Sequence, residues 1–178
     1  QIVGFFNYTI LSSPFEQTLL SKIKWIIGNK FNLKNFSLFR SFGVNQIIKP
    51  SLKKSETLKA LKIYKVIKNN IKDKRDVMDI KVDGIKIGDL IYDTYIKSRR
   101  KPTVNFNEDF FKMVLDFCKL YIFWDEYFKK NNIQSLVGVH TAYSYGLPLR
   151  IAFYKEIPTY CVTSRRIHRL SKKMQFAG

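Results

Sequence analysis

A strand–helix–strand pattern in the last third of the chain most limits the possible folds. Residues 135–139 form a continuous apolar run, which is typical of a parallel strand buried on both faces. This run is followed by a loop over residues 140–146 and by a helical pattern over residues 147–155. A second strand pattern covers residues 159–163. Two strands joined by such a crossover should lie adjacent and parallel, with a right-handed connection. We therefore expect an α/β fold with a Rossmann-like parallel sheet flanked by helices.

Upstream segments add one more strand and several helices to this expectation. Residues 2–6 are apolar, with β-branched and aromatic side chains, which indicates a short buried strand. The Ser-Pro pair at 13–14 is typical of a helix start, and the aromatic segment over residues 35–42 indicates a short helix. Ser55 should cap an amphipathic helix, and Asn107 should cap a long, almost wholly apolar helix that packs centrally.

The sequence is strongly basic, with 32 Lys and Arg against 14 Asp and Glu in 178 residues, a net charge of +18. Such a balance favours a polyanionic partner. Most of the excess is lysine, however, and the accompanying abundance of Ile, Asn and Phe is typical of an AT-rich genome, which weakens the case for nucleic acid. Five lysines form one stripe of the helix near Ser55, and we expect them to be exposed and unpaired: Lys59, Lys62, Lys65, Lys68 and Lys72. This stripe is either a solvated helix face or a basic rim for an anionic inner-membrane surface.

The chain begins at Gln1 and ends at Gly178 in mid-pattern, so we expect it to be a piece of a longer protein. No apolar run approaches about 18 residues and no secretory signal is visible, which favours a cytoplasmic protein.

Cys118 and Cys161 lack metal-binding or redox spacing and should be buried free thiols. No metal-ligand spacing occurs, so we expect no metal. Neither a Walker loop nor a dinucleotide-binding glycine motif occurs, so we expect no cofactor and neither nucleotide hydrolysis nor dinucleotide redox chemistry.

Polar side chains follow both strands of the strand–helix–strand pattern. His140 comes directly after the first strand, and Ser164, Arg165 and Arg166 come directly after the second. Ligands of open α/β sheets bind beyond the carboxyl ends of the strands. A histidine there can act as a general base near neutral pH, and the arginines can bind phosphate or carboxylate in a bidentate manner. The alternative for His140 is a purely structural histidine that caps the following helix.

A second candidate group is a pair of carboxylates around residue 90. A turn at residues 83–84 precedes a helix that Asp89 can cap. Asp89 and Asp93 are i,i+4 neighbours and repel each other unless a cation, a hydroxyl or a dipole stabilises them. The helix start stabilises Asp89, whereas Asp93 has no evident local partner. Asp93 is therefore either an alternative catalytic base or a solvated surface acid.

Two segments resemble bacterial proteins of surface-polysaccharide synthesis, which make capsule or O-antigen. One is residues 83–96 (DGIKIGDLIYDTYI), and the other is residues 140–160, with HTAY, Gly146, LRIA and IPTY. Those proteins look like glycosyltransferases with two Rossmann-like domains, the GT-B arrangement. The resemblance spans roughly residues 80–165. It implies that residues 1–178 are one N-terminal, acceptor-side domain, with a nucleotide-sugar domain beyond Gly178.

The resemblance implies transfer of a sugar from a nucleotide-sugar donor, which is a substrate rather than a cofactor, to a saccharide or lipid-linked acceptor. His140 would deprotonate or orient the acceptor hydroxyl, with Asp93 as the alternative base. Residues that would contact the sugars or the donor phosphates are Tyr92, Tyr143, Tyr145, Arg150, Ser164, Arg165 and Arg166. A nucleic-acid-binding module and a non-catalytic scaffold domain are the competing interpretations. The basic charge and the aromatic residues near lysines favour the nucleic-acid module, but no recognition motif supports it.

Overall fold

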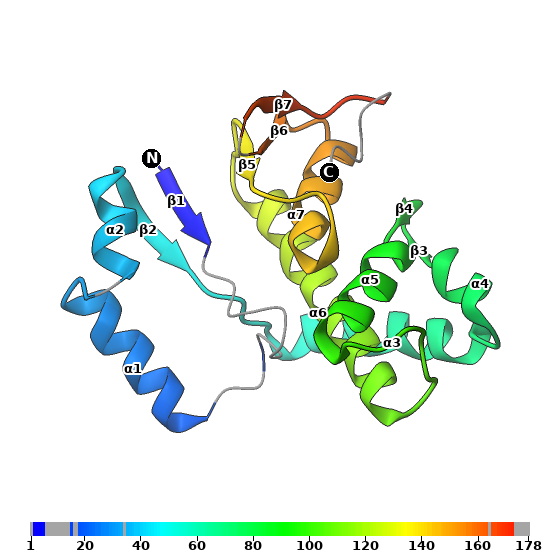
Figure 1. Ribbon diagram of the computed structural model, residues 1–178. Coiled ribbons are helices and arrows are strands. Elements are labelled where there is room, and N and C mark those ends of the chain that lie inside the picture. Colours follow the sequence, from blue (N-terminus) through cyan, green and yellow to red (C-terminus); the bar gives the residue numbers. More distant parts are fainter. Residues whose placement is uncertain (1, 6–14, 16–17, 34, 164, 173–178) are drawn as a thin grey trace. The chain divides into compact units, whose positions relative to one another are not determined.

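The computed structural model of the chain describes residues 2–5, 15, 18–33, 35–163 and 165–172 (Figure 1). The fold is mixed α/β, mostly helical, with small sheets. The chain divides into two compact units, residues 1–51 and residues 52–178, which are described separately. None of the described helices combines the length and the apolarity that a bilayer-spanning segment requires.

The first unit contains a parallel pair of strands with two helices between them in the sequence. Its elements are β1 (Ile2–Phe5), α1 (Leu19–Lys30), α2 (Asn35–Ser41) and β2 (Val44–Ile48). Phe36 of α2 packs with Val44 and Ile47 of β2 to form a small buried cluster. The predicted strand and short helix are present, but the strand is not buried as predicted: Ile2 is more than half exposed and residues 3–5 are half-buried. The predicted helix start at residues 13–14 lies outside the described residues.

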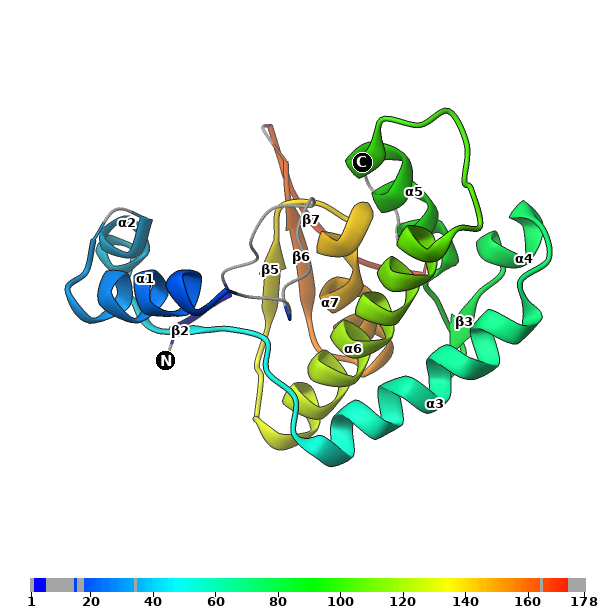
Figure 2. The ribbon, with the colours of Figure 1, turned by 90° about the horizontal axis from the view of Figure 1, so that it is seen from below.

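The second unit is built around one long helix. Its elements are α3 (Lys54–Asn70), α4 (Lys74–Met78), β3 (Lys81–Val82), β4 (Ile85–Lys86), α5 (Gly88–Arg99), α6 (Glu108–Lys130), β5 (Leu136–Gly138), α7 (Tyr143–Tyr154), β6 (Thr159–Val162) and β7 (Ile167–Arg169). Helix α6 packs against α3, α5 and α7, and Figure 2 shows it between α3 and the layer formed by α7 and the strands. The side-chain oxygen of Asn107 accepts a hydrogen bond from the Phe110 N–H at 3.0 Å, so the predicted cap and central helix are confirmed.

The predicted strand–helix–strand unit is present. Strands β5 and β6 are parallel, with Leu136 opposite Thr159 and Gly138 opposite Cys161. Strand β7 then pairs antiparallel with β6, so the chain after residue 163 turns back as a hairpin. The Thr163 N–H donates a hydrogen bond to the Arg166 carbonyl at 2.9 Å and closes the turn that makes this hairpin possible.

Two details of this unit differ from the prediction. Strand β5 is not buried on both faces, because Val137 is 61% exposed, as is Val139 just beyond the strand. The reason is that α7 packs on the other face: successive side chains of a strand point to opposite faces, and a Cβ on Gly138 would come within 2.9 Å of Leu149 of α7. Helix α7 begins at Tyr143 rather than at residue 147. Its first turn is packed closely, since a Cβ on Gly146 would lie only 2.0 Å from the Thr141 carbonyl oxygen.

The turn at residues 83–84 is confirmed and joins β3 to β4. Asp83 and Gly84 both have positive φ, at 49° and 79°, which suits a two-residue hairpin turn. The Tyr121 hydroxyl of α6 donates a hydrogen bond to Asp83 at 3.0 Å, so the hairpin is attached to the central helix. Burial, followed by the neighbouring Asp83, raises the pKa of Tyr121 and keeps its hydroxyl protonated.

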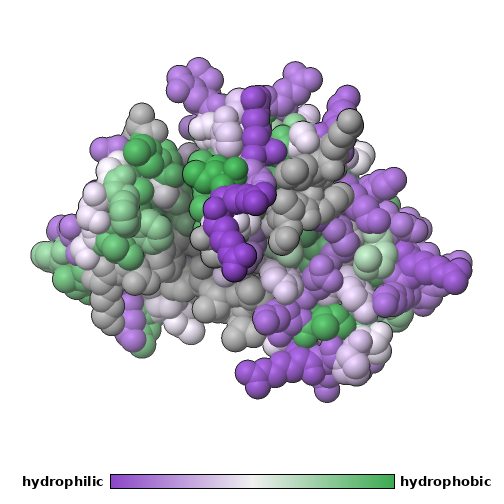
Figure 3. All heavy atoms as spheres, turned by 45° about the horizontal axis from the view of Figure 1, so that its top comes forward, coloured by the Kyte–Doolittle hydropathy of each residue, from purple (hydrophilic) through white to green (hydrophobic). Residues whose placement is uncertain are grey.

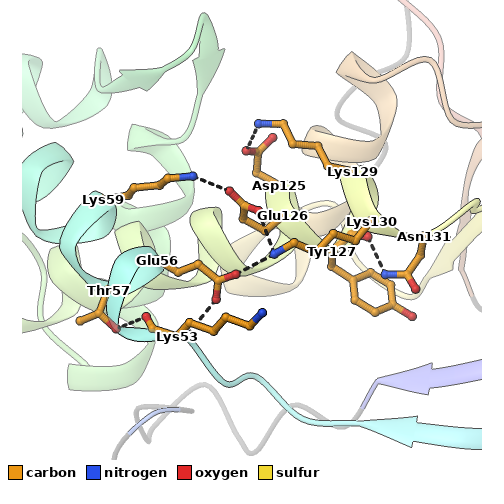
Figure 4. A network of polar contacts seen from close by, with 10 residues as sticks. All are labelled: Lys53, Glu56, Thr57, Lys59, Asp125, Glu126, Tyr127, Lys129, Lys130 and Asn131. Atoms are coloured by element: carbon orange, nitrogen blue, oxygen red, sulfur yellow. Dashed lines mark hydrogen bonds and ion pairs between the residues drawn. The ribbon is translucent and has the colours of Figure 1, made fainter.

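Ion pairs join α3 to α6 (Figure 4). Lys59 of α3 lies 2.7 Å from a Glu126 oxygen, and Lys130 of α6 lies 2.7 Å from Glu56 and 2.9 Å from Glu126. The helix cap is Lys53 rather than Ser55, and the Lys53 N–H donates to Glu56 at 2.8 Å. The prediction that the lysine stripe is exposed and unpaired is therefore only partly confirmed. Lys59 is paired, and the ammonium of Lys68 lies 5.1 Å from the Phe111 ring centre. The other three, Lys62, Lys65 and Lys72, are exposed.

Candidate functional site

The carboxyl end of β5 carries His140 on the exposed surface of the second unit. The strand lies directly against α7, because a Cβ on Gly138 would come within 2.9 Å of Leu149. His140 follows two residues later, and its ring centre lies 6.3 Å from that of Tyr145 at an interplanar angle of 44°. The structure thus brings together two of the predicted site residues.

The start of α7 next to His140 has unusual backbone geometry. Tyr143 has a φ of 56°, which is uncommon for a residue with a side chain. Ala142 occupies the N-cap position and provides no side-chain hydrogen bond to the first turn. The unbonded N–H groups of a helix start favour a negative charge or a hydroxyl oxygen nearby. Tyr143 and Tyr145 are both half-buried in this turn.

The arginines predicted for the same edge follow β6. Because β5 and β6 are parallel and Gly138 lies opposite Cys161, the segments after both strands emerge at the same edge of the sheet. Arg165 and Arg166 are exposed in the turn between β6 and β7, and the Arg166 N–H donates to the Thr163 hydroxyl at 3.2 Å. Ser164 lies outside the described residues.

Arg150 occupies a different environment from the one the sequence suggested. It lies on α7 with only 8% of its side chain exposed, and its guanidinium makes two hydrogen bonds to the Asp89 carboxylate, at 2.6 and 2.5 Å. A third bond reaches the Lys86 carbonyl at 2.8 Å. Arg150 therefore joins α7 to α5 and to β4 inside the protein, with its guanidinium occupied by Asp89 and by the Lys86 carbonyl. Asp89 in turn is stabilised by this arginine and not only by its helix start.

Asp93 lies one turn beyond Asp89 on α5 and is exposed. Partial burial of the carboxylate, followed by the negative charge of Asp89, raises the pKa of Asp93, while Arg150 acts in the opposite direction. A raised carboxyl pKa is a frequent property of groups that transfer protons in active sites. On the same helix Tyr92 is half-buried, and the Lys74 ammonium lies 4.6 Å from its ring centre.

A pocket of about 590 Å³ lies at the opposite end of this strand–helix unit, and none of its lining residues was among the predicted site residues. It is formed by the end of α7, the segment that leads into β6 and the segment that follows β7. Its lining residues are Phe153, Tyr154, Glu156, Ile157, Pro158, Thr159, Arg169, Leu170 and Lys172. Three of them, Ile157, Pro158 and Thr159, belong to the IPTY segment, but no spacing in the sequence connects that segment with residues 169–172, because only the fold brings them together.

In the described part of the chain, no cluster of three or more His, Cys, Asp or Glu side chains has an arrangement that could hold a metal ion. Cys118 and Cys161 are both buried and free, as predicted. Comparison of the chain with protein-family models, with curated proteins and with solved structures finds no match.

Proposed function

We propose that residues 1–178 form the acceptor-side domain of a bacterial glycosyltransferase that acts in surface-polysaccharide synthesis. The proposal includes the Rossmann-like fold and a cytoplasmic location. Two observations support such a fold: β5 and β6 form a parallel pair connected through α7, and β1 and β2 form a parallel pair connected through α1 and α2. The resemblance of residues 83–96 and 140–160 to proteins of this class is the sequence argument for the activity.

The position of His140 is the observation that carries the proposed chemistry. It is exposed at the carboxyl end of a strand, next to Tyr145 and to the start of α7. In the proposed reaction the imidazole accepts the proton of an acceptor hydroxyl while that oxygen attacks the anomeric carbon of the donor sugar. The bond between that carbon and the nucleotide phosphate breaks, and the nucleotide leaves with the bonding electrons. Asp93, with its raised pKa, is the alternative base.

The other groups at this edge would bind rather than react. Arg165 and Arg166 supply positive charge for the donor phosphates or for an acidic acceptor. Tyr143 and Tyr145 supply ring faces and hydroxyls for a sugar. Tyr92, which lies on α5 with Lys74 over its ring, supplies a further ring face and hydroxyl.

The test is a transferase assay on the protein expressed from its whole reading frame. It would be incubated with a panel of nucleotide sugars and with saccharide or lipid-linked acceptors, and release of the nucleotide would be measured. His140→Ala should reduce turnover by about 10²–10⁴ if His140 is the base. Its melting temperature should not change, because an exposed side chain leaves no cavity.

Two matched variants complete this test. His168→Ala removes the other histidine, which lies on β7 opposite Cys161, and should leave turnover within a factor of about two to three of the wild-type value, below the range expected for loss of a general base. Asp93→Asn tests the alternative base. Activity unaffected by His140→Ala but lost in Asp93→Asn would transfer the role to Asp93. No turnover with any nucleotide sugar, together with salt-sensitive binding to single-stranded RNA, would replace the proposal by the nucleic-acid module.

A further inference from the structure

Helix α1 of the first unit is apolar on two opposite faces. Its inner face packs on α2: the Trp25 and Phe36 rings meet edge to face at 6.0 Å, and a Cβ on Gly28 would lie 2.7 Å from the Phe36 ring. Its outer face is also apolar but exposed. The exposed fractions of the residues along it are Leu19 75%, Leu20 61%, Ile23 43%, Ile26 57%, Ile27 45% and Phe31 64%.

These six side chains form one continuous surface, which we call the α1 apolar face. At about 100° of rotation per residue, they fall within an arc of about 140° around the helix axis. Figure 3 shows apolar side chains, in green, gathered on the unit that contains α1 and α2. A surface helix in a water-soluble unit normally turns its polar side outward. A contiguous exposed apolar patch of this kind indicates a surface that binds a partner.

Lysines lie at both edges of the α1 apolar face. By the same rotation of about 100° per residue, Lys22 lies about 40° beyond one edge and Lys24 about 20° beyond the other, while Lys30, in the last turn, falls within the arc itself. All three are exposed. Residues 1–51 as a whole contain six Lys and Arg residues and one Glu, a net charge of +5. The apolar face is therefore bordered by positive charge in a unit with almost no acidic residues.

This combination fits an anionic membrane surface better than a protein partner. The cores of protein interfaces are depleted in lysine. In a twofold dimer, moreover, the lysines around one face would meet the equally basic border of a second copy, which costs free energy. At a bilayer the apolar arc enters the acyl boundary, while lysine stems extend toward headgroups that carry the opposite charge.

We propose that α1 is an interfacial helix that lies flat on an anionic membrane. Its apolar face enters the lipid and Lys22, Lys24 and Lys30 contact the headgroups. The proposal goes beyond the glycosyl-transfer function and does not depend on it. It also differs from the expectation for α3, where the lysine stripe includes a lysine paired with Glu126 and another over an aromatic ring.

The experiment measures partitioning of the whole chain onto vesicles by co-sedimentation. Vesicles of phosphatidylcholine alone are compared with vesicles that contain about one third phosphatidylglycerol, at low and at high salt. The wild-type chain should bind the anionic vesicles, and the bound fraction should fall steeply as salt screens the lysines. The double variant Ile23→Ser/Ile27→Ser should lower the partition coefficient about tenfold or more, because two side chains no longer enter the lipid.

A matched pair on α3 serves as the control. Leu58 and Val66 are also exposed apolar residues, at 52% and 63%, on a helix that carries five lysines. Leu58→Ser/Val66→Ser should change vesicle binding less than twofold if the α1 apolar face is the membrane contact, because these two side chains then bury no apolar area in the lipid; a twofold change corresponds to about half a buried methylene. Circular dichroism spectra of both double variants should match the wild type, because all four side chains point away from the buried clusters.

Three results would overturn the proposal. One is a wild-type chain that does not bind anionic vesicles at low salt. Another is an equal loss of binding in the α1 and α3 double variants. The third is a concentration-dependent dimer that the α1 variant abolishes while vesicle binding is unchanged, which would assign the face to a second copy of the chain.

Discussion

The buried pair formed by Arg150 and Asp89 should make a larger contribution to stability than any exposed ion pair of this protein. Arg150→Met removes the guanidinium and leaves the Asp89 carboxylate, of which 21% is exposed, without its partner. Removing one partner of a buried pair costs about 3–5 kcal/mol. Because solvent still reaches part of Asp89, we expect about 3 kcal/mol, the lower end of that range. At about 2–4 °C per kcal/mol for a chain of this size, the melting temperature should fall by about 6–12 °C.

Arg99→Met is the matched control for this experiment. Arg99 makes the same bidentate contact with Asp109, at 2.5 Å for both bonds, but the two side chains are 36% and 41% exposed. Exposed pairs contribute about 0–1 kcal/mol, so this variant should lose less than about 1 kcal/mol. The two variants thus compare one geometry at two degrees of burial.

The assay is urea-induced unfolding followed by circular dichroism, with a double-mutant cycle. Asp89→Leu combined with Arg150→Met should recover stability relative to either single variant, because no charge is then left unpaired. If Arg150→Met were no more destabilising than Arg99→Met, burial would not decide the strength of the pair and the reasoning would be refuted. Such a result would also return Arg150 to the list of groups available to a ligand.

Three further predictions concern the second unit. Hydrogen bonds from two lysines hold the pKa of Glu126 down to about 2. The stabilisation that Glu126 contributes is therefore present above its unfolded-state pKa near 4.5 and is lost as the pH falls toward 2. In a profile of unfolding free energy against pH, Glu126→Gln should flatten this acid limb. Gly88→Ala should destabilise the protein by more than 2 kcal/mol in urea unfolding, roughly the upper range for overpacking, because its Cβ would lie 1.9 Å from a backbone oxygen. Gly84→Ala, which has open space but a φ of 79°, should cost only about 1–2 kcal/mol. Burial raises the pKa of Cys118 to about 12 and also raises that of Cys161, so neither thiol should react with a thiol reagent at pH 8 until the protein is unfolded, as a colorimetric titration would show.

Short-range signals in the sequence predicted the local elements well. The turn at residues 83–84, the Asn107 cap and the strand–helix–strand unit each depend on residues that lie close together in the chain. Backbone preference and capping chemistry act over a few residues, so a single sequence contains them. The parallel pairing of β5 and β6 was also predictable, because a helical crossover leaves few other arrangements.

Contacts between distant elements could not be predicted in the same way. Arg150 lies 61 positions from Asp89, and the sequence offered no reason to prefer this partner over a ligand phosphate. In the sequence Lys59 is likewise one of five equivalent lysines, and only the packing of α6 against α3 brings Glu126 beside it. Both side chains are chemically suited to several partners, and packing selects among them.

The sequence by itself therefore determined the types of the elements, the positive charge and the placement of His140 immediately after a strand. Only the tertiary structure decided which charged groups are committed to one another, that β5 lies at a sheet edge with Val137 exposed, and that α1 turns an apolar face outward. The physical reason is that helix and strand periodicity report which residues share a face. They do not report what that face meets, which depends on how elements far apart in the chain pack together.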